Sequence, residues 1–123
     1  MPRPKSAHVA HPDCPAPLAF AILGGKWKLW ILQILIFEGT QRFGSLKRAI
    51  TGITQTMLTS QLRALEEDGL VRRKVFAEVP PRVEYSATRD AMALAPMFTS
   101  MHDWWKARES PASRRASRTS RTR

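Results

Sequence analysis

The apolar residues of this chain fall into a series of segments with helical spacing, and the first two lie close together near the N-terminus. Residues 15–23 begin with a proline, which suits the first turn of a helix, and place Leu18 and Ile22 on one face. The pair Gly24-Gly25 ends this segment. Residues 26–38 are apolar on nearly every side, which predicts a helix buried over most of its surface. A second subunit could bury part of that surface.

Two shorter helical segments follow, joined by a turn that contains a glycine. Residues 45–50 carry apolar side chains at helical spacing, and Thr54 is a good N-cap for a second helix over residues 55–68. Three leucines of that second helix form its inward row, and Gly69 is its C-terminal stop. Two short helices joined in this way are typical of a helix-turn-helix.

An alternating segment then predicts a pair of β-strands. Residues 70–76 are rich in β-branched side chains, and residues 83–86 are able to pair back with them. The six-residue link contains Pro80-Pro81 and is too stiff for a simple hairpin turn, so we interpret residues 76–83 as a wing.

A final helix is expected from Thr88, its predicted N-cap, onward. Pro96 lies inside this segment and is expected to kink the helix or to interrupt its hydrogen bonding. One face of the helix carries an apolar stripe, which consists of Met92, Ala95, Phe98, Met101 and Trp105.

The order of these elements predicts a mainly α fold with a small β-hairpin (α+β). The specific expectation is a winged helix-turn-helix with N- and C-terminal dimerisation helices. Residues 1–13 are expected to form a flexible arm, residues 14–109 the folded domain, and residues 110–123 a disordered tail rich in arginine and serine.

Size and charge refine this picture. A chain of 123 residues has room for one hydrophobic core. The net charge of +10 favours polyanionic partners such as nucleic acid, although five arginines of residues 110–123 supply half of it. The N-terminus has no apolar stretch of a secretory signal, and the longest apolar run is much shorter than the ~20 residues of a membrane span. A cytoplasmic, nucleoid-associated protein without a membrane partner is therefore expected.

The sequence argues against an enzyme. It contains no glycine-rich phosphate loop, no nucleophile elbow of the G-x-S-x-G type and no evident pair of catalytic carboxylates. Only three histidines are present, two of them in the expected arm, so groups for acid–base chemistry are scarce. We expect no catalytic residue and no cofactor.

Candidate DNA contacts lie on the helix of residues 55–68 and around it. Its N-terminal half has no acid, whereas Glu66, Glu67 and Asp68 stand at its far end, as suits a helix whose N-terminus enters the major groove. Arg63 is able to bind guanine or phosphate. Arg42, Lys47 and Arg48, which we place on the preceding helix, are candidates for phosphate contacts. Basic residues of the wing could lie along the DNA backbone or reach the minor groove, where narrow regions attract arginine. An ordinary solvated surface would have the same composition. The candidates are Arg42, Lys47, Arg48, Thr54, Gln55, Thr56, Thr59, Ser60, Arg63, Lys74 and Arg82.

The four tryptophans fit either a ligand pocket or a core and interface, and their helical spacing favours the second interpretation. Apolar helices near both ends of a small domain are suited to form a dimer interface, and a palindromic DNA operator requires a dimer. The candidate interface residues are Leu18, Ile22, Trp27, Phe98, Met101 and Trp105.

Cys14 is the only cysteine, so no intramolecular disulfide is possible. It stands beside Pro15 at the start of a predicted helix, where the helix dipole favours a reactive thiolate, although its spacing alone fits an unreactive cysteine better. The spacing of His8, His11, Asp13 and Cys14 matches no established metal site, so no metal is expected.

Several longer motifs are similar to those of HxlR-type winged helix-turn-helix regulators, over about residues 14–107. These motifs are Cys14-Pro15, Gly24-Gly25-Lys26-Trp27, Arg42-Phe43, Met57-Leu58-Thr59, Leu62-Arg63, Leu65-Glu66-Glu67-Asp68-Gly69-Leu70-Val71 and Pro80-Pro81-Arg82-Val83-Glu84-Tyr85-Ser86. The chain departs from the family pattern at Gly44, where serine is common, at Ala87, where leucine is usual, and at Ala91, where glycine is usual.

The resemblance implies a bacterial transcription factor that acts as a homodimer on a double-stranded operator. In such a protein the first and last helices build the dimer interface, residues 55–68 enter the major groove, and the wing with Arg82 contacts flanking DNA. In some similar proteins the cysteine at the position of Cys14 senses oxidants or electrophiles, which makes Cys14 a candidate sensor. The alternative is a small-ligand or protein-interaction module on a winged-helix scaffold that binds DNA only nonspecifically.

Overall fold

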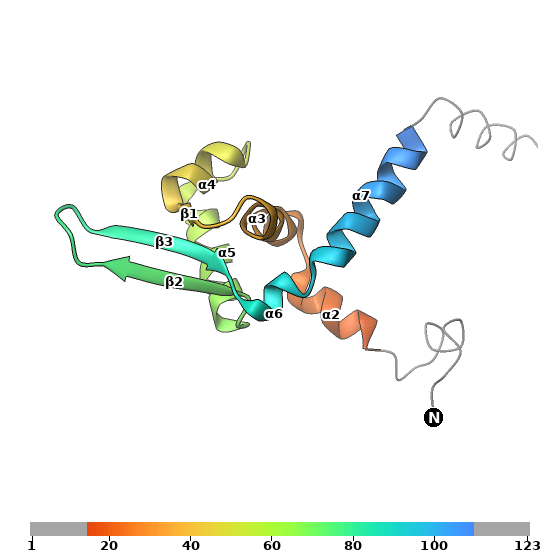
Figure 1. Ribbon diagram of the computed structural model, residues 1–123, viewed down its shortest axis with the longest axis horizontal. Coiled ribbons are helices and arrows are strands. Elements are labelled where there is room, and N and C mark those ends of the chain that lie inside the picture. Colours follow the sequence, from red (N-terminus) through yellow and green to blue (C-terminus); the bar gives the residue numbers. More distant parts are fainter. Residues whose placement is uncertain (1–14, 110–123) are drawn as a thin grey trace, which may run out of the picture.

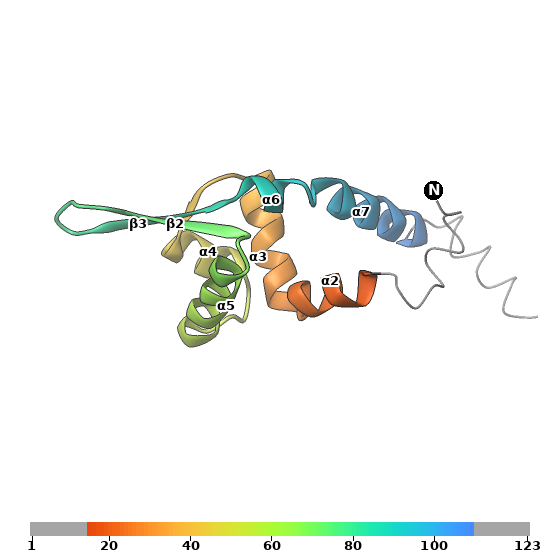
Figure 2. The ribbon, with the colours of Figure 1, turned by 90° about the horizontal axis from the view of Figure 1, so that it is seen from below.

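A β-ribbon projects from one side of a group of helices, and two helices leave the group on the other side (Figures 1 and 2). The computed structural model describes residues 15–109. In chain order the elements are α2 (Ala16–Leu23), α3 (Lys26–Phe37), β1 (Gln41–Arg42), α4 (Phe43–Ala49), α5 (Gln55–Glu67), β2 (Val71–Phe76), β3 (Arg82–Ala87), α6 (Arg89–Met92) and α7 (Ala95–Glu109). The mainly α winged helix-turn-helix predicted from the sequence is confirmed. The predicted arm and tail lie outside the described residues.

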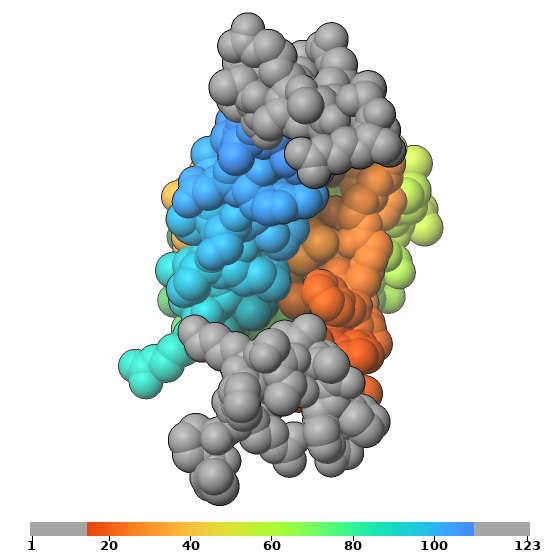
Figure 3. Space-filling view, turned by 90° about the vertical axis from the view of Figure 1, so that its right-hand side faces the viewer, coloured from red at the N-terminus to blue at the C-terminus, as the bar shows by residue number. Residues whose placement is uncertain are grey.

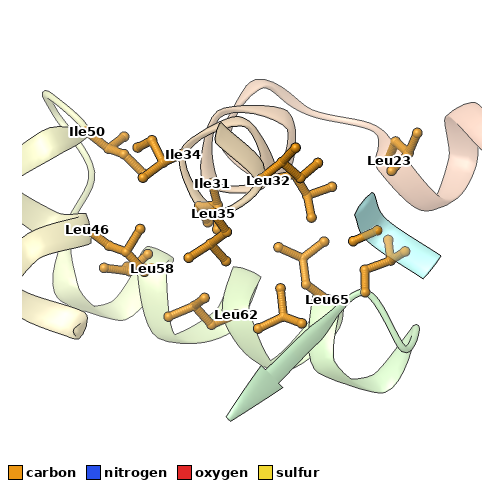
Figure 4. Packing of buried hydrophobic residues seen from close by; sticks show 14 of the residues in the cluster. Leu23, Ile31, Leu32, Ile34, Leu35, Leu46, Ile50, Leu58, Leu62 and Leu65 are labelled. Carbon is orange, nitrogen blue, oxygen red and sulfur yellow. The ribbon is translucent and has the colours of Figure 1, made fainter. Parts of the chain in front are cut away.

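Helix α3 runs through the centre of the hydrophobic core. Five of its side chains are buried, and Figure 4 shows several of them beside leucines of α4 and α5. The predicted inward row of α5 is confirmed, since Leu58, Leu62 and Leu65 are almost fully buried. Trp30 and Phe37 remain exposed, so α3 is covered on most of its surface but not all round.

The helix-turn-helix consists of α4 and α5. Gly52 in the turn between them has a φ of +91°, a conformation that glycine adopts without strain. The predicted cap is confirmed, because the Thr54 hydroxyl accepts a hydrogen bond of 3.1 Å from the Met57 N–H. Helix α4 begins at Phe43, two residues before the predicted start, and its N-cap residue Arg42 makes no side-chain capping bond.

The sheet has three antiparallel strands in the order β1-β3-β2. Strands β2 and β3 pair from Val71 with Ala87 to Phe76 with Arg82, close to the predicted hairpin. Strand β1 was not predicted, because two residues are too few to show an alternating pattern. It pairs Gln41 with Tyr85 and Arg42 with Glu84 and so ties the start of the helix-turn-helix to the ribbon.

The prediction of one final helix is wrong, because α6 and α7 are separate helices. The Thr88 cap is confirmed, since its hydroxyl accepts a hydrogen bond of 3.2 Å from the Ala91 N–H. The break lies at Ala93 and Leu94, and Pro96 falls in the first turn of α7. Its missing N–H has no helical partner at that position, so the proline begins a new helix instead of kinking a continuous one.

Within residues 15–109, no single helix is long and apolar enough to cross a bilayer. The pair α2 and α3, bent by 86°, meets the length and composition of a broken span. Most apolar side chains of α3 are already used in the core.

Candidate nucleic-acid interface

The outward face of α5 carries the hydrogen-bonding side chains predicted to contact DNA. Gln55, Thr56, Ser60 and Arg63 are exposed and Thr59 is half-buried, opposite the buried leucine row. The first turn has no acidic residue, so the positive end of the helix dipole is open to an anion. The structure therefore places these predicted α5 residues opposite the buried leucine row, and α5 itself lies beside the base of the ribbon (Figure 1).

Thr54 has a structural task as well. Its hydroxyl oxygen accepts the Met57 N–H, which leaves the hydroxyl hydrogen available to a phosphate oxygen. Loss of this side chain would therefore change both the helix cap and any DNA contact.

The basic residues before α5 do not all lie on one helix. Lys47 and Arg48 are exposed in the last turn of α4, and Arg48 Nη2 lies 3.5 Å from Ser45 Oγ. Arg42, interpreted from the sequence as part of the same helix, instead lies in strand β1 opposite Glu84. The earlier interpretation is corrected because Arg42 has an extended backbone and ends the strand.

Lys74 and Arg82 lie on the same face of the sheet, around Glu84. Lys74 and Glu84 are directly opposite each other in the ladder, and Arg82 Nε lies 3.2 Å from Glu84 Oε2. Arg82 Nη1 also lies 3.1 Å from Glu78 Oε1, and its guanidinium stacks 3.9 Å from the centre of the Phe76 ring. Arg82 is thus held by neighbours within the wing.

Arg73 is a further candidate, outside the set predicted from the sequence. Side chains alternate along a strand, so Arg73 lies on the opposite face from Lys74. There it faces a groove between α5 and the ribbon, which we name the α5–β2 groove and which is lined by Thr59, Leu62, Arg63, Glu66, Glu67, Arg73 and Tyr85. Every second side chain of a strand lies on the same face, so Arg73 shares a face with the buried Val71, whereas Arg72 and Lys74 lie on the other face. This alternation could have identified Arg73 from the sequence.

Neither Arg63 nor Arg73 forms an ion pair within residues 15–109. Both side chains approach the α5–β2 groove, one from the helix and one from the ribbon. A DNA strand that passes between a helix and a wing would present its phosphates to such a pair.

The predicted interface residues belong to α2, α3 and α7, and Figure 3 shows α7 beside α3 with α2 close by. Leu18 and Ile22 of α2 and Met101 and Trp105 of α7 are between 45% and 71% exposed. Trp27 is half-buried and stacks on Trp30 at 6.1 Å between ring centres. Phe98 is only 7% exposed and packs edge-on against Phe37, so in a single chain it belongs to the core.

Cys14, His8, His11 and Asp13 lie outside the described residues. The described part of the chain contains no group of three or more histidine, cysteine, aspartate or glutamate side chains that could hold a metal ion.

Comparison with known proteins gives consistent matches. The profile of the HxlR-like helix-turn-helix family matches residues 22–113. YybR, an uncharacterized HTH-type transcriptional regulator of Bacillus subtilis, is 41% identical over 104 residues, which cover 85% of this chain and 82% of YybR. The redox regulator HypR in its oxidized form has a TM-score of 0.72 at 40% identity, over 79% of this chain and 99% of HypR. The reduced form of the B. subtilis transcriptional regulator YodB has a TM-score of 0.68 at 33% identity, over 82% and 96% of the two chains.

Proposed function

Because this chain belongs to the HxlR-like helix-turn-helix family of DNA-binding transcriptional regulators, we propose that it binds a palindromic or pseudo-palindromic operator as a homodimer. The observation that carries the proposal is the outward face of α5. That face combines amides and hydroxyls with Arg63, and acids stand only at its far end. Such a helix is suited to enter the major groove by its N-terminus.

In this proposal the α5 side chains read bases, and the surrounding basic residues hold the DNA in register. Gln55 and Arg63 have the planar donor groups that pair with purine edges. Lys47 and Arg48 on α4 lie where phosphate contacts would orient the domain. The wing, residues 76–83, contacts DNA that flanks the bases read by α5.

The homodimer is supported by the exposed apolar side chains of α2 and α7. A soluble monomer seldom leaves several large side chains exposed together, and such patches are typical of subunit contacts. In the dimer, Leu18, Ile22, Met101 and Trp105 would be covered, and a two-fold axis would place two copies of α5 on successive turns of DNA.

The signal, in this proposal, acts through Cys14. This residue directly precedes Pro15, the N-cap of α2. HypR, similar to this chain over most of its length, is described as a redox regulator. Oxidation or alkylation at the edge of α2 would alter the helix that we assign to the dimer interface.

The direct test is selection of bound genomic fragments by the full-length protein, followed by footprinting. We expect a protected palindromic site with half-sites about one or two helical turns apart. Lack of a protected region at every salt concentration would contradict sequence-specific binding.

A second candidate function is a small-ligand module, which a groove between α3 and α7 favours. Its lining combines aromatic and polar groups, namely Lys26, Leu29, Trp30, Gln33, Phe98, Met101 and His102. This alternative would be preferred if an aromatic ligand bound tightly while duplex DNA bound weakly and without sequence dependence.

A further inference from the structure

The side chain of Arg82 joins both strands of the ribbon to the wing tip, which we define as residues 77–81. It contacts Glu78 at 3.1 Å in the tip and Glu84 at 3.2 Å on its own strand. Its guanidinium carbon lies 3.9 Å from the centroid of the Phe76 ring, which is its partner across the ladder. A planar guanidinium is able to pair with carboxylates and to stack on an aromatic ring at the same time. Arg82 is therefore committed to contacts inside the wing.

The wing tip itself is apolar and carries no basic residue. Its sequence is Ala-Glu-Val-Pro-Pro, and the one charged side chain, Glu78, is paired with Arg82. Val79 is fully exposed at 102% of its reference area, and the two prolines that follow restrict the backbone. The ribbon carries this tip well away from the helices (Figures 1 and 2). A tip of this composition has no charge with which to attract phosphate.

We propose that the wing contacts DNA through this apolar tip, with Val79 packed in the minor groove, and that Arg82 is a positioning residue for the tip. The inference rests on the proposed operator binding and specifies how the wing takes part in it. The minor groove is only about 6 Å wide, which excludes a helix but admits a narrow loop with short side chains. Apolar side chains are widely used to contact the minor groove at base steps.

The first test compares two valines of the same ribbon, with full-length protein and a fragment recovered by the selection. Val79→Ala removes two methyl groups from the tip and should weaken operator binding about fivefold. The dependence of affinity on salt should stay unchanged, because no phosphate contact is lost. Val75→Ala is the matched control, since Val75 is also exposed but lies within β2, outside the tip, where it pairs with Val83. The affinity of this variant should remain within about twofold of wild type.

The second test separates positioning by Arg82 from a phosphate contact. Arg82→Ala should weaken binding about as much as Val79→Ala, and the double variant should be no weaker than either single variant. Arg82→Lys should fail to restore affinity, because lysine keeps the charge but loses the planar pairing and stacking. The minor-groove ligand netropsin should compete with the wild type more strongly than with Val79→Ala.

The outcomes distinguish this inference from the proposed function. If the wild type protects an operator and Val79→Ala binds it equally well, the apolar tip is not a DNA contact. If Arg82→Lys restores affinity and Arg82→Ala lowers the salt slope by about one unit, Arg82 holds phosphate and the positioning role is wrong. Failure of the wild type to bind any operator would overturn the proposed function itself.

Discussion

The hydroxyl of Thr88 donates a hydrogen bond of 2.7 Å to the carbonyl oxygen of Gly69, nineteen residues earlier in the chain. The hydroxyl oxygen of Thr88 also accepts a hydrogen bond of 3.2 Å from the Ala91 N–H and so caps α6. Gly69 ends α5 with a φ of +75°. The side chain of Thr88 thus connects the end of α5 to the start of α6.

This relationship predicts an unusually large effect for a half-buried threonine. Thr88→Val keeps the shape but loses both hydrogen bonds, and we expect a loss of about 1–2 kcal/mol in the free energy of unfolding. Thr88→Ser keeps the hydroxyl and should lose less. Urea unfolding of the two variants measures the difference, and equal stabilities would show that the hydroxyl contributes little.

Arg63 is predicted to contribute to sequence preference. Arg63→Ala should weaken binding to the best operator by about 1–3 kcal/mol and narrow the difference between matched and mismatched sites. Competition binding against single-base variants of the operator provides the measurement. A uniform loss on every sequence would assign Arg63 to phosphate.

The two faces of β2 should differ in their electrostatic contribution. Arg73 faces the α5–β2 groove and Arg72 faces away, so Arg73→Ala should lower the slope of log affinity against log salt by about one unit. Arg72→Ala is a control of equal charge and should change the slope less. Equal changes in both variants would contradict the assignment of Arg73 to the DNA-facing groove.

The dimer is predicted to depend on the exposed apolar side chains of α2. Leu18 is 71% exposed, so Leu18→Asp should leave the core intact while it places a charge in the proposed interface. Sedimentation should then detect monomers, and circular dichroism should show an unchanged fold. Footprinting should no longer detect protection of the complete operator. A Leu18→Asp variant that remains dimeric would place the interface elsewhere.

The response to oxidants should depend on Cys14. Diamide should change the operator affinity of the wild type, and Cys14→Ser should abolish that change because no other thiol is present in the chain. The same footprinting fragment serves for both proteins. Equal responses in the two proteins would exclude thiol sensing.

The elements that were predictable from the sequence are those in which several local signals agree. For α5, the cap residue Thr54, the row of buried leucines and the terminal Gly69 all indicate the same helix. For the last segment the local signals disagree, because the apolar stripe continues from α6 into α7 whereas Pro96 indicates an interruption. The structure resolves this disagreement with two separate helices, and both Ala91 of α6 and Phe98 of α7 are buried in the core.

The candidate site was predictable by residue type but not by contact. The sequence identified Arg82 as a basic residue of a wing. Its contacts within the wing, however, depend on Phe76 across the ladder and on two nearby carboxylates. Strand β1 likewise exists only because β3 offers it an edge. Such pairings are determined by tertiary structure and are not visible in a local pattern.

The central position of α3 has a mechanical consequence. Its buried side chains pack against α5, and its Phe37 ring packs edge-on against Phe98 of α7. A close-packed core transmits a displacement because it has little free volume in which to absorb one. In a dimer joined through α2 and α7, α3 would transmit a rotation of one subunit against the other to α5. Such a rotation would change the distance between the two copies of α5.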